Sequence, residues 1–156
     1  MSDAAIAMTE EAGGQTLTMT RRFAAPRERV YAAWADGNQV ARWFGPESVT
    51  CTVHEWDAQV DGNYSLTMNH ADGDTTDLSG TFREISPPER LVYTWTWGGD
   101  GGMAGRETLL TLDFEAAGDE TVLHLTHSLL LDEDWAQKHS MGWGSSFDSL
   151  AAMLAS

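Results

Sequence analysis

The C-terminal stretch 132–155 constrains the fold of this chain more than any other feature of its sequence. Its large side chains recur every three or four residues, the spacing that places them on one face of an α-helix. Acidic residues at 132–134 stand where a helix start favours negative charge and capping oxygens. The sequence therefore predicts one long amphipathic C-terminal helix. Its buried stripe consists of Trp135, His139, Trp143, Phe147, Leu150 and Leu154.

Small residues follow another side of the same predicted helix. Gly142 and Gly144 each cost about 1 kcal/mol relative to alanine inside a helix, but burial of the large apolar side chains outweighs that cost. Gly142, Ser146, Ser149 and Ala152 form a small-residue edge. We expect this edge to let a strand approach the helix closely.

Most of the remaining chain alternates apolar and polar residues, which is typical of strands. Strands are predicted at 16–23, 48–55, 62–70, 75–85, 90–97, 106–115 and 121–129. Short helices are predicted at 27–36 and 38–43, because Pro26 suits a first helical position, Gly37 separates them, and Gly45-Pro46 ends the second.

The order of these elements predicts an α+β fold. Hairpin-length connections make the sheet antiparallel, and one of its faces must be covered. The C-terminal helix is the only predicted element long enough to cover it. We therefore expect a curved antiparallel sheet of about seven strands that grips this helix, with two short helices after the first strand. Space that side chains leave unfilled between sheet and helix would be a pocket.

Residues 1–14 show no periodicity and end in Gly13-Gly14, so they are predicted to be a flexible N-terminal tail. Residues 15–156 have the length of a single domain. No apolar run approaches the roughly 20 residues that a membrane-spanning helix needs. The start of the chain has no basic residue before Arg21, unlike a signal peptide, and we expect a cytoplasmic protein.

The charge is strongly acidic, with 24 acidic against 9 basic residues and a net charge of −15. Such a charge repels nucleic acids and anionic membranes, so neither is an expected partner. Two interpretations of the acidic surface stay open: ordinary solvation, or adaptation to high salt, which screens the repulsion.

Few residues fit a metal or nucleophile site. The single cysteine, Cys51, excludes an intramolecular disulfide, and we expect it to be a small buried apolar side chain. His124 and His127 are three apart on a strand and face opposite sides. His54 and His70 lack partners at ligand spacing, so no metal or cofactor is expected. The glycine-rich segment 98–105 has no lysine and reads as a hairpin loop.

Three polar side chains lie on faces predicted to point inward. His127 and His139 either line the pocket mouth, where they orient a ligand or act as acid and base, or are hydrogen-bonded core histidines, His139 to a backbone carbonyl. Arg21 either forms an ion pair at the corner between the first strand and the first helix, or binds a ligand carboxylate. Trp34 and Trp43 are predicted to be structural residues of the two short helices.

Three segments at 21–46, 80–95 and 139–143 resemble the activator of heat-shock protein ATPase homologue family. The first reads RRFAAPRERVYAAWADGNQVARWFGP, the second reads GTFREISPPERLVYTW, and the third reads HSMGW. That family belongs to the START-like superfamily with the helix-grip fold, and many bacterial members have no assigned role. The resemblance implies one domain over 15–156 and a hydrophobic cavity between sheet and long helix.

The expected function is to bind a small hydrophobic or aromatic ligand, in a monomer or homodimer. Alternatives are a cyclase or hydrolase that uses the pocket histidines, and a chaperone-activator-like interaction protein; an enzyme is the less favoured class. Four tryptophans facing the gap would suit a flat ligand. The predicted ligand-binding residues are Tyr64, Met68, Tyr93, Trp95, Trp97, His127, Trp135, His139 and Trp143.

Overall fold

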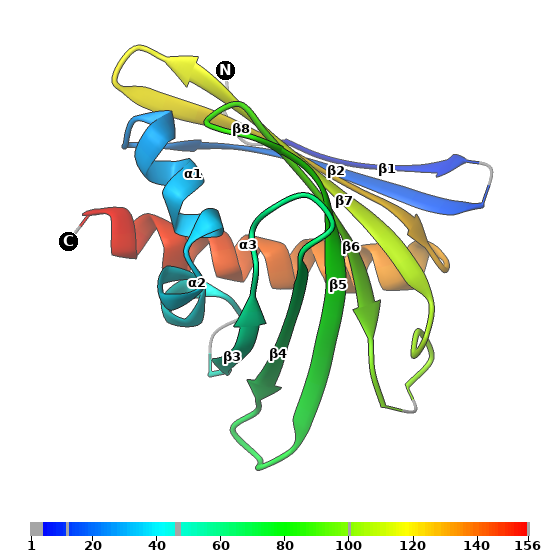
Figure 1. Ribbon diagram of the computed structural model, residues 1–156. Helices are drawn as coiled ribbons and strands as arrows, with labels where there is room; N and C mark the ends of the chain where they lie inside the picture. The colour runs from blue at the N-terminus through cyan, green and yellow to red at the C-terminus, as the bar shows by residue number, and fades with distance from the viewer. Residues whose placement is uncertain (1–4, 12, 46–47, 100, 156) are drawn as a thin grey trace.

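Eight antiparallel strands form one curved sheet, and a long C-terminal helix crosses one of its faces (Figure 1). The computed structural model describes residues 5–11, 13–45, 48–99 and 101–155. The strand order is β1-β2-β8-β7-β6-β5-β4-β3. The strands are β1 (Ala5–Glu11), β2 (Gly14–Phe23), β3 (Thr50–Trp56), β4 (Asn63–Asn69), β5 (Thr75–Ser86), β6 (Arg90–Trp97), β7 (Glu107–Ala117) and β8 (Glu120–Leu130). The helices are α1 (Arg27–Ala35), α2 (Gly37–Trp43) and α3 (Glu133–Ala155).

The predicted α+β architecture is confirmed, with eight strands in place of about seven. The additional strand, β1, lies within the residues expected to form a flexible tail. It pairs with β2, with Ile6 opposite Met19 and Met8 opposite Leu17. Gly13 turns the chain between the two strands with a φ of 95°. The tail prediction therefore fails over 5–11, while residues 1–4 and 12 lie outside the described residues.

Helix α3 begins and packs as its sequence predicts. The Asp132 carboxylate accepts a hydrogen bond of 3.0 Å from the backbone N–H of Trp135, which caps the first turn. Trp143, Phe147 and Leu150 are buried against the sheet. None of the described helices has the length and apolar character that crossing a membrane requires.

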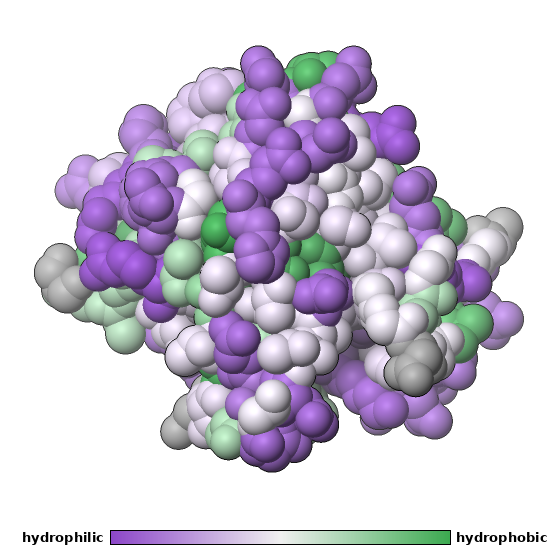
Figure 2. Space-filling view, turned by 60° about the horizontal axis from the view of Figure 1, so that its bottom comes forward, coloured by the Kyte–Doolittle hydropathy of each residue, from purple (hydrophilic) through white to green (hydrophobic). Residues whose placement is uncertain are grey.

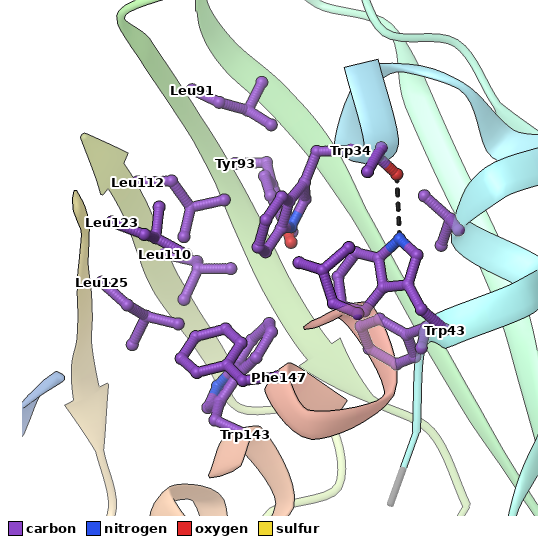
Figure 3. Packing of buried hydrophobic residues seen from close by; sticks show 14 of the residues in the cluster. Trp34, Trp43, Leu91, Tyr93, Leu110, Leu112, Leu123, Leu125, Trp143 and Phe147 are labelled. Atoms are coloured by element: carbon purple, nitrogen blue, oxygen red, sulfur yellow. Dashed lines mark hydrogen bonds between the residues drawn. The ribbon is translucent and has the colours of Figure 1, made fainter. Parts of the chain in front are cut away.

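Helices α1 and α2 close one end of the space between α3 and the sheet (Figure 3). Trp34 and Trp43 are completely buried there, with ring centroids 4.6 Å apart. The indole N–H of Trp43 donates to the carbonyl of Ala33 at 3.0 Å, and that of Trp56 donates to the carbonyl of Trp34 at 2.7 Å. Both tryptophans of the short helices therefore pack in the core, as predicted.

Candidate ligand-binding site

A pocket of about 190 Å³ remains between α3 and the sheet, at the end away from α1. Its interior walls are aromatic rings from three elements. Trp95 of β6 lies 5.1 Å from Trp143 of α3 and 5.7 Å from Phe44 after α2, measured between ring centroids. All three side chains are at least nine-tenths buried. The lining residues are Phe44, Gly45, Met68, Trp95, Trp97, Trp135, Lys138, His139, Gly142, Trp143 and Ser146.

The pocket opens at a rim where Trp97 and Trp135 are half-buried and Lys138 is exposed. These three residues form the rim of the pocket. The Lys138 ammonium lies over the Trp135 ring, 4.3 Å from its centroid, in the geometry of a cation–π contact. Figure 2 shows one face of the molecule, on which a small patch of hydrophobic surface near the middle is bordered by hydrophilic side chains.

The loop after α2 brings one wall against α3. Helix α2 ends at Trp43, and the backbone N–H of the next residue, Phe44, donates to the Val40 carbonyl at 2.9 Å. Gly45 follows with a φ of 110°, which favours glycine, and turns the chain toward the helix. Its N–H donates to Ser146 Oγ at 3.1 Å. Phe44 is thereby held at the pocket by a contact between segments about one hundred residues apart in the sequence.

His139 has both ring nitrogens in hydrogen bonds within the protein. Its Nδ1 lies 2.7 Å from the backbone carbonyl of Trp135, which only accepts, so Nδ1 carries the hydrogen. Its Nε2 accepts from the Trp97 indole N–H at 3.0 Å. The interpretation of His139 as bonded to a backbone carbonyl is confirmed.

His127 likewise has both ring nitrogens in hydrogen bonds within the protein. The Thr108 hydroxyl donates its one hydrogen to the Trp95 carbonyl at 2.8 Å. Toward His127 Nε2, which lies 2.8 Å away, the same hydroxyl can therefore only accept, so Nε2 carries the ring hydrogen. His127 Nδ1 accepts from the Trp143 indole N–H at 3.3 Å. Alternation along β8 turns this ring inward, and His124 points to the other side, where it bonds to Glu115 at 2.8 Å.

Burial keeps both inward-facing histidines neutral. Desolvation lowers the pKa of His127 well below its ordinary value, and the neighbouring His139 lowers it further. Desolvation also lowers the pKa of His139, against a smaller opposing effect of its bond to the Trp135 carbonyl. Because each neutral ring uses its one donor and its one acceptor inside the protein, neither has a lone pair free for proton transfer.

Six of the nine predicted ligand-binding residues line the pocket: Met68, Trp95, Trp97, Trp135, His139 and Trp143. Tyr64, Tyr93 and His127 do not. Tyr64 and Tyr93 lie nearer α1, with ring centroids 5.2 Å apart, and the Tyr64 hydroxyl donates to the Thr94 carbonyl at 2.6 Å. Figure 3 shows Tyr93 beside Trp34 in the packed core. His127 faces inward but lies behind the indoles of Trp95 and Trp143.

The lining also includes residues absent from the sequence-based set: Phe44, Gly45, Lys138, Gly142 and Ser146. A Cβ at Gly142 would meet nothing within 4 Å, so the predicted close approach of a strand is wrong at this position. Gly142 and Ser146 follow His139 by three and seven residues, the helical spacing that places all three on one face. That spacing could have identified Gly142 and Ser146 as lining residues from the sequence.

Arg21 and Cys51 lie outside this pocket. Arg21 Nη1 pairs with Asp148 Oδ1 of α3 at 2.9 Å, so the expected ion pair forms, although its partner is on α3 and not at the corner before α1. Burial raises the pKa of the Cys51 thiol to about 11, which keeps it protonated and unreactive. The described residues contain no cluster of three or more histidine, cysteine or acidic side chains that could hold a metal.

Comparison with known proteins places the chain in a family. The sequence profile described as Activator of Hsp90 ATPase homolog 1-like protein matches residues 24–155. A crystal structure of a protein from Chromobacterium violaceum is 30% identical with a TM-score of 0.83, covering 89% of this chain and 96% of that one. The AHSA1 protein of Silicibacter pomeroyi is 30% identical with a TM-score of 0.81, covering 90% and 97%.

A solution structure of a protein from Arthrobacter aurescens shares the fold at 21% identity, with a TM-score of 0.82 and coverage of 96% of this chain and 91% of that one. Comparison with curated proteins gives no significant match. The profile match and the two structures at 30% identity agree over most of the chain. This protein therefore belongs to the family of Activator of Hsp90 ATPase homolog 1-like proteins.

Proposed function

We propose that this protein binds a small, flat aromatic molecule in the pocket between α3 and the sheet. The observation that carries the proposal is a pocket of about 190 Å³ walled by aromatic rings, two of which, Trp97 and Trp143, donate their indole N–H groups to buried histidines. Hydrophobic ligands are common among proteins of this fold. A ligand here gains apolar burial and ring–ring contacts, each worth about 0.5–1.5 kcal/mol beyond the buried area.

The pocket volume limits the size of this ligand. A dry apolar cavity of about 150 Å³ holds one benzene molecule, whereas pockets for drug-sized ligands span about 300–1,000 Å³. A pocket of about 190 Å³ therefore matches one or two fused rings. Long acyl chains and four-ring compounds exceed this volume and would project past the rim into solvent.

The walls favour an apolar ligand body because their indole N–H groups either donate within the protein or, at Trp95, are buried out of reach of the pocket. The indole N–H groups of Trp97 and Trp143 donate to His139 and His127. A ligand in the interior therefore contacts mainly the faces and edges of aromatic rings. No observation favours a cyclase or hydrolase that uses the two histidines, and the chaperone-activator alternative rests on the family resemblance alone.

Indole N–H resonances of ¹⁵N-labelled protein, followed during titration with naphthalene, test this proposal. We expect shifts for Trp95, Trp97 and Trp143 at the pocket, and unchanged signals for Trp34 and Trp56 near α1. Naphthalene is the probe because it is flat, uncharged and of the size that the pocket admits. Absence of shifts up to its solubility limit would contradict the proposal, as would shifts confined to the α1 end.

Two matched variants test where the ligand binds. Gly142→Leu places a side chain where the pocket is open, and Gly144→Leu makes the same change two residues along the same helix, outside the pocket lining. Both replace a helical glycine and should preserve or raise the melting temperature. We expect Gly142→Leu to abolish naphthalene binding and Gly144→Leu to retain it; equal binding by the two variants would place the ligand elsewhere.

A further inference from the structure

We propose further that the ligand is an aromatic acid, whose rings enter the pocket and whose carboxylate meets Lys138 at the rim. This inference rests on the proposed function and adds the polar half of the ligand. Its basis is one cation at the pocket mouth, in a lining whose described residues include no acidic side chain and whose Ser146 hydroxyl keeps its hydrogen available as a donor.

Lys138 is the single lysine of a chain with a net charge of −15, and it lies at the pocket. Among the described lining residues it is the one side chain with a full charge, and none is acidic. Asp134 stands one helical turn before it, yet the two form no ion pair; the ammonium lies over Trp135 instead. A cation held at the pocket mouth and unpaired with any carboxylate is suited to an anionic ligand group.

The neutral polar groups of the lining point to the same ligand chemistry. Ser146 Oγ accepts from the N–H of Gly45 at 3.1 Å, which leaves its own hydrogen available as a donor. The acceptor nitrogen of His139 already takes the hydrogen of Trp97. A ligand with acceptor atoms complements this set, and a carboxylate is an acceptor-only group.

The acidic surface does not cancel this local attraction. Charges farther apart than the Debye length, about 8 Å at physiological salt, are largely screened when exposed to solvent. The carboxylate at Lys138 would be in direct contact, where charge-assisted hydrogen bonds are roughly twice as strong as neutral ones. Repulsion by the rest of the surface slows the approach of an anion more than it weakens its contact.

Calorimetric titration with three naphthalene derivatives of nearly equal size tests the inference. The probes are 2-naphthoate, neutral 2-naphthamide and cationic 2-naphthylmethylamine, at pH 7 and about 0.15 M salt. We expect 2-naphthoate to bind about tenfold more tightly than 2-naphthamide, which corresponds to about 1.4 kcal/mol, and the amine to bind most weakly.

Variants at Lys138 assign the preference to its charge. Lys138→Met keeps an unbranched side chain over Trp135 and should bind 2-naphthoate and 2-naphthamide equally, and Lys138→Arg should restore the preference. Arg83→Met is the matched control, because Arg83 is an exposed residue of β5 outside the pocket lining whose loss changes the net charge equally. It should keep the full tenfold preference.

The outcomes separate this inference from the proposed function. If 2-naphthamide binds as tightly as 2-naphthoate, or if Lys138→Met keeps the preference, the aromatic-acid inference is wrong while the aromatic pocket stands. Equal losses in Lys138→Met and Arg83→Met would assign the effect to overall charge and also contradict the inference. If none of the three compounds binds, the proposed function itself fails.

Discussion

The imidazole rings of His127 and His139 lie 5.0 Å apart, centroid to centroid, between β8 and α3. Two such rings cannot both become charged in a buried site at low cost, and each is held neutral by fixed hydrogen bonds. The pair therefore supports the pocket wall through Trp97 and Trp143 and is not arranged for acid–base chemistry.

Stability should fall as the pH is lowered below about 6.5. In the unfolded chain each of these two histidines takes up a proton near its ordinary pKa of 6.5, while the lowered pKa of the folded state prevents this. The contribution of the two neutral histidines to the free energy of unfolding is fully present above that pH. It is lost as the pH falls below it, at about 1.4 kcal/mol per pH unit for each histidine. Urea unfolding between pH 8 and 5.5 measures this slope. A free energy of unfolding that stays constant over the range would contradict the neutral pair.

Thr108→Val should destabilise the protein by about 1–3 kcal/mol, because it leaves the buried N–H of His127 and the carbonyl of Trp95 without their partner. Thr111→Val is the matched control on the same strand, at a half-buried position on the other face of the sheet. It should change the free energy of unfolding by less than about 0.5 kcal/mol in urea denaturation. Equal effects of the two substitutions on the free energy of unfolding would show that the buried hydrogen bonds of Thr108 do not contribute the expected stability.

Trp97→Phe should raise the pKa of His139 toward its ordinary value. The substitution removes the indole N–H that occupies Nε2 and leaves that lone pair free to bind a proton. Titration of the histidine ring resonances by NMR measures the shift. Trp56→Phe removes a different indole hydrogen bond, to the Trp34 carbonyl, and should leave the His139 titration unchanged. An unaltered pKa in Trp97→Phe would contradict the assigned hydrogen-bond pattern.

Added salt should raise the melting temperature. The net charge of −15 makes the folded chain repel itself, and the Debye length falls from about 10 Å at 0.1 M to about 3 Å at 1 M salt. The ion pairs that screening would weaken, such as Arg21 with Asp148, are at least partly exposed and worth under about 1 kcal/mol each. Melting curves in increasing KCl check this, and a flat response would remove the hypothesis of salt adaptation.

Periodicity predicted most of the fold because most elements have one buried face. Alternation identified the strands from β2 to β8, and helical spacing identified α3. It missed β1, where six of seven residues are exposed, so that no apolar face marks the strand. The pairing of β1 with β2 depends on backbone hydrogen bonds, which leave no trace in the pattern of side chains.

The candidate site was predicted less completely, because side-chain direction along a strand does not tell where the pocket lies. Tyr93 and Trp95 both point inward from β6, but one step of two residues, roughly 7 Å, separates the packed core from the open space. Phe44 and Gly45 enter through a loop contact with Ser146. A contact between segments so far apart in the chain has no local sequence signal.

A crystal structure of the protein grown with naphthalene tests the central claim most directly. Our account predicts density for one flat molecule between Trp95, Trp143 and Phe44, with the ring planes of these residues little changed. A pocket closed by the side chains of α3 and β6, or naphthalene bound only on the outer surface, would contradict it.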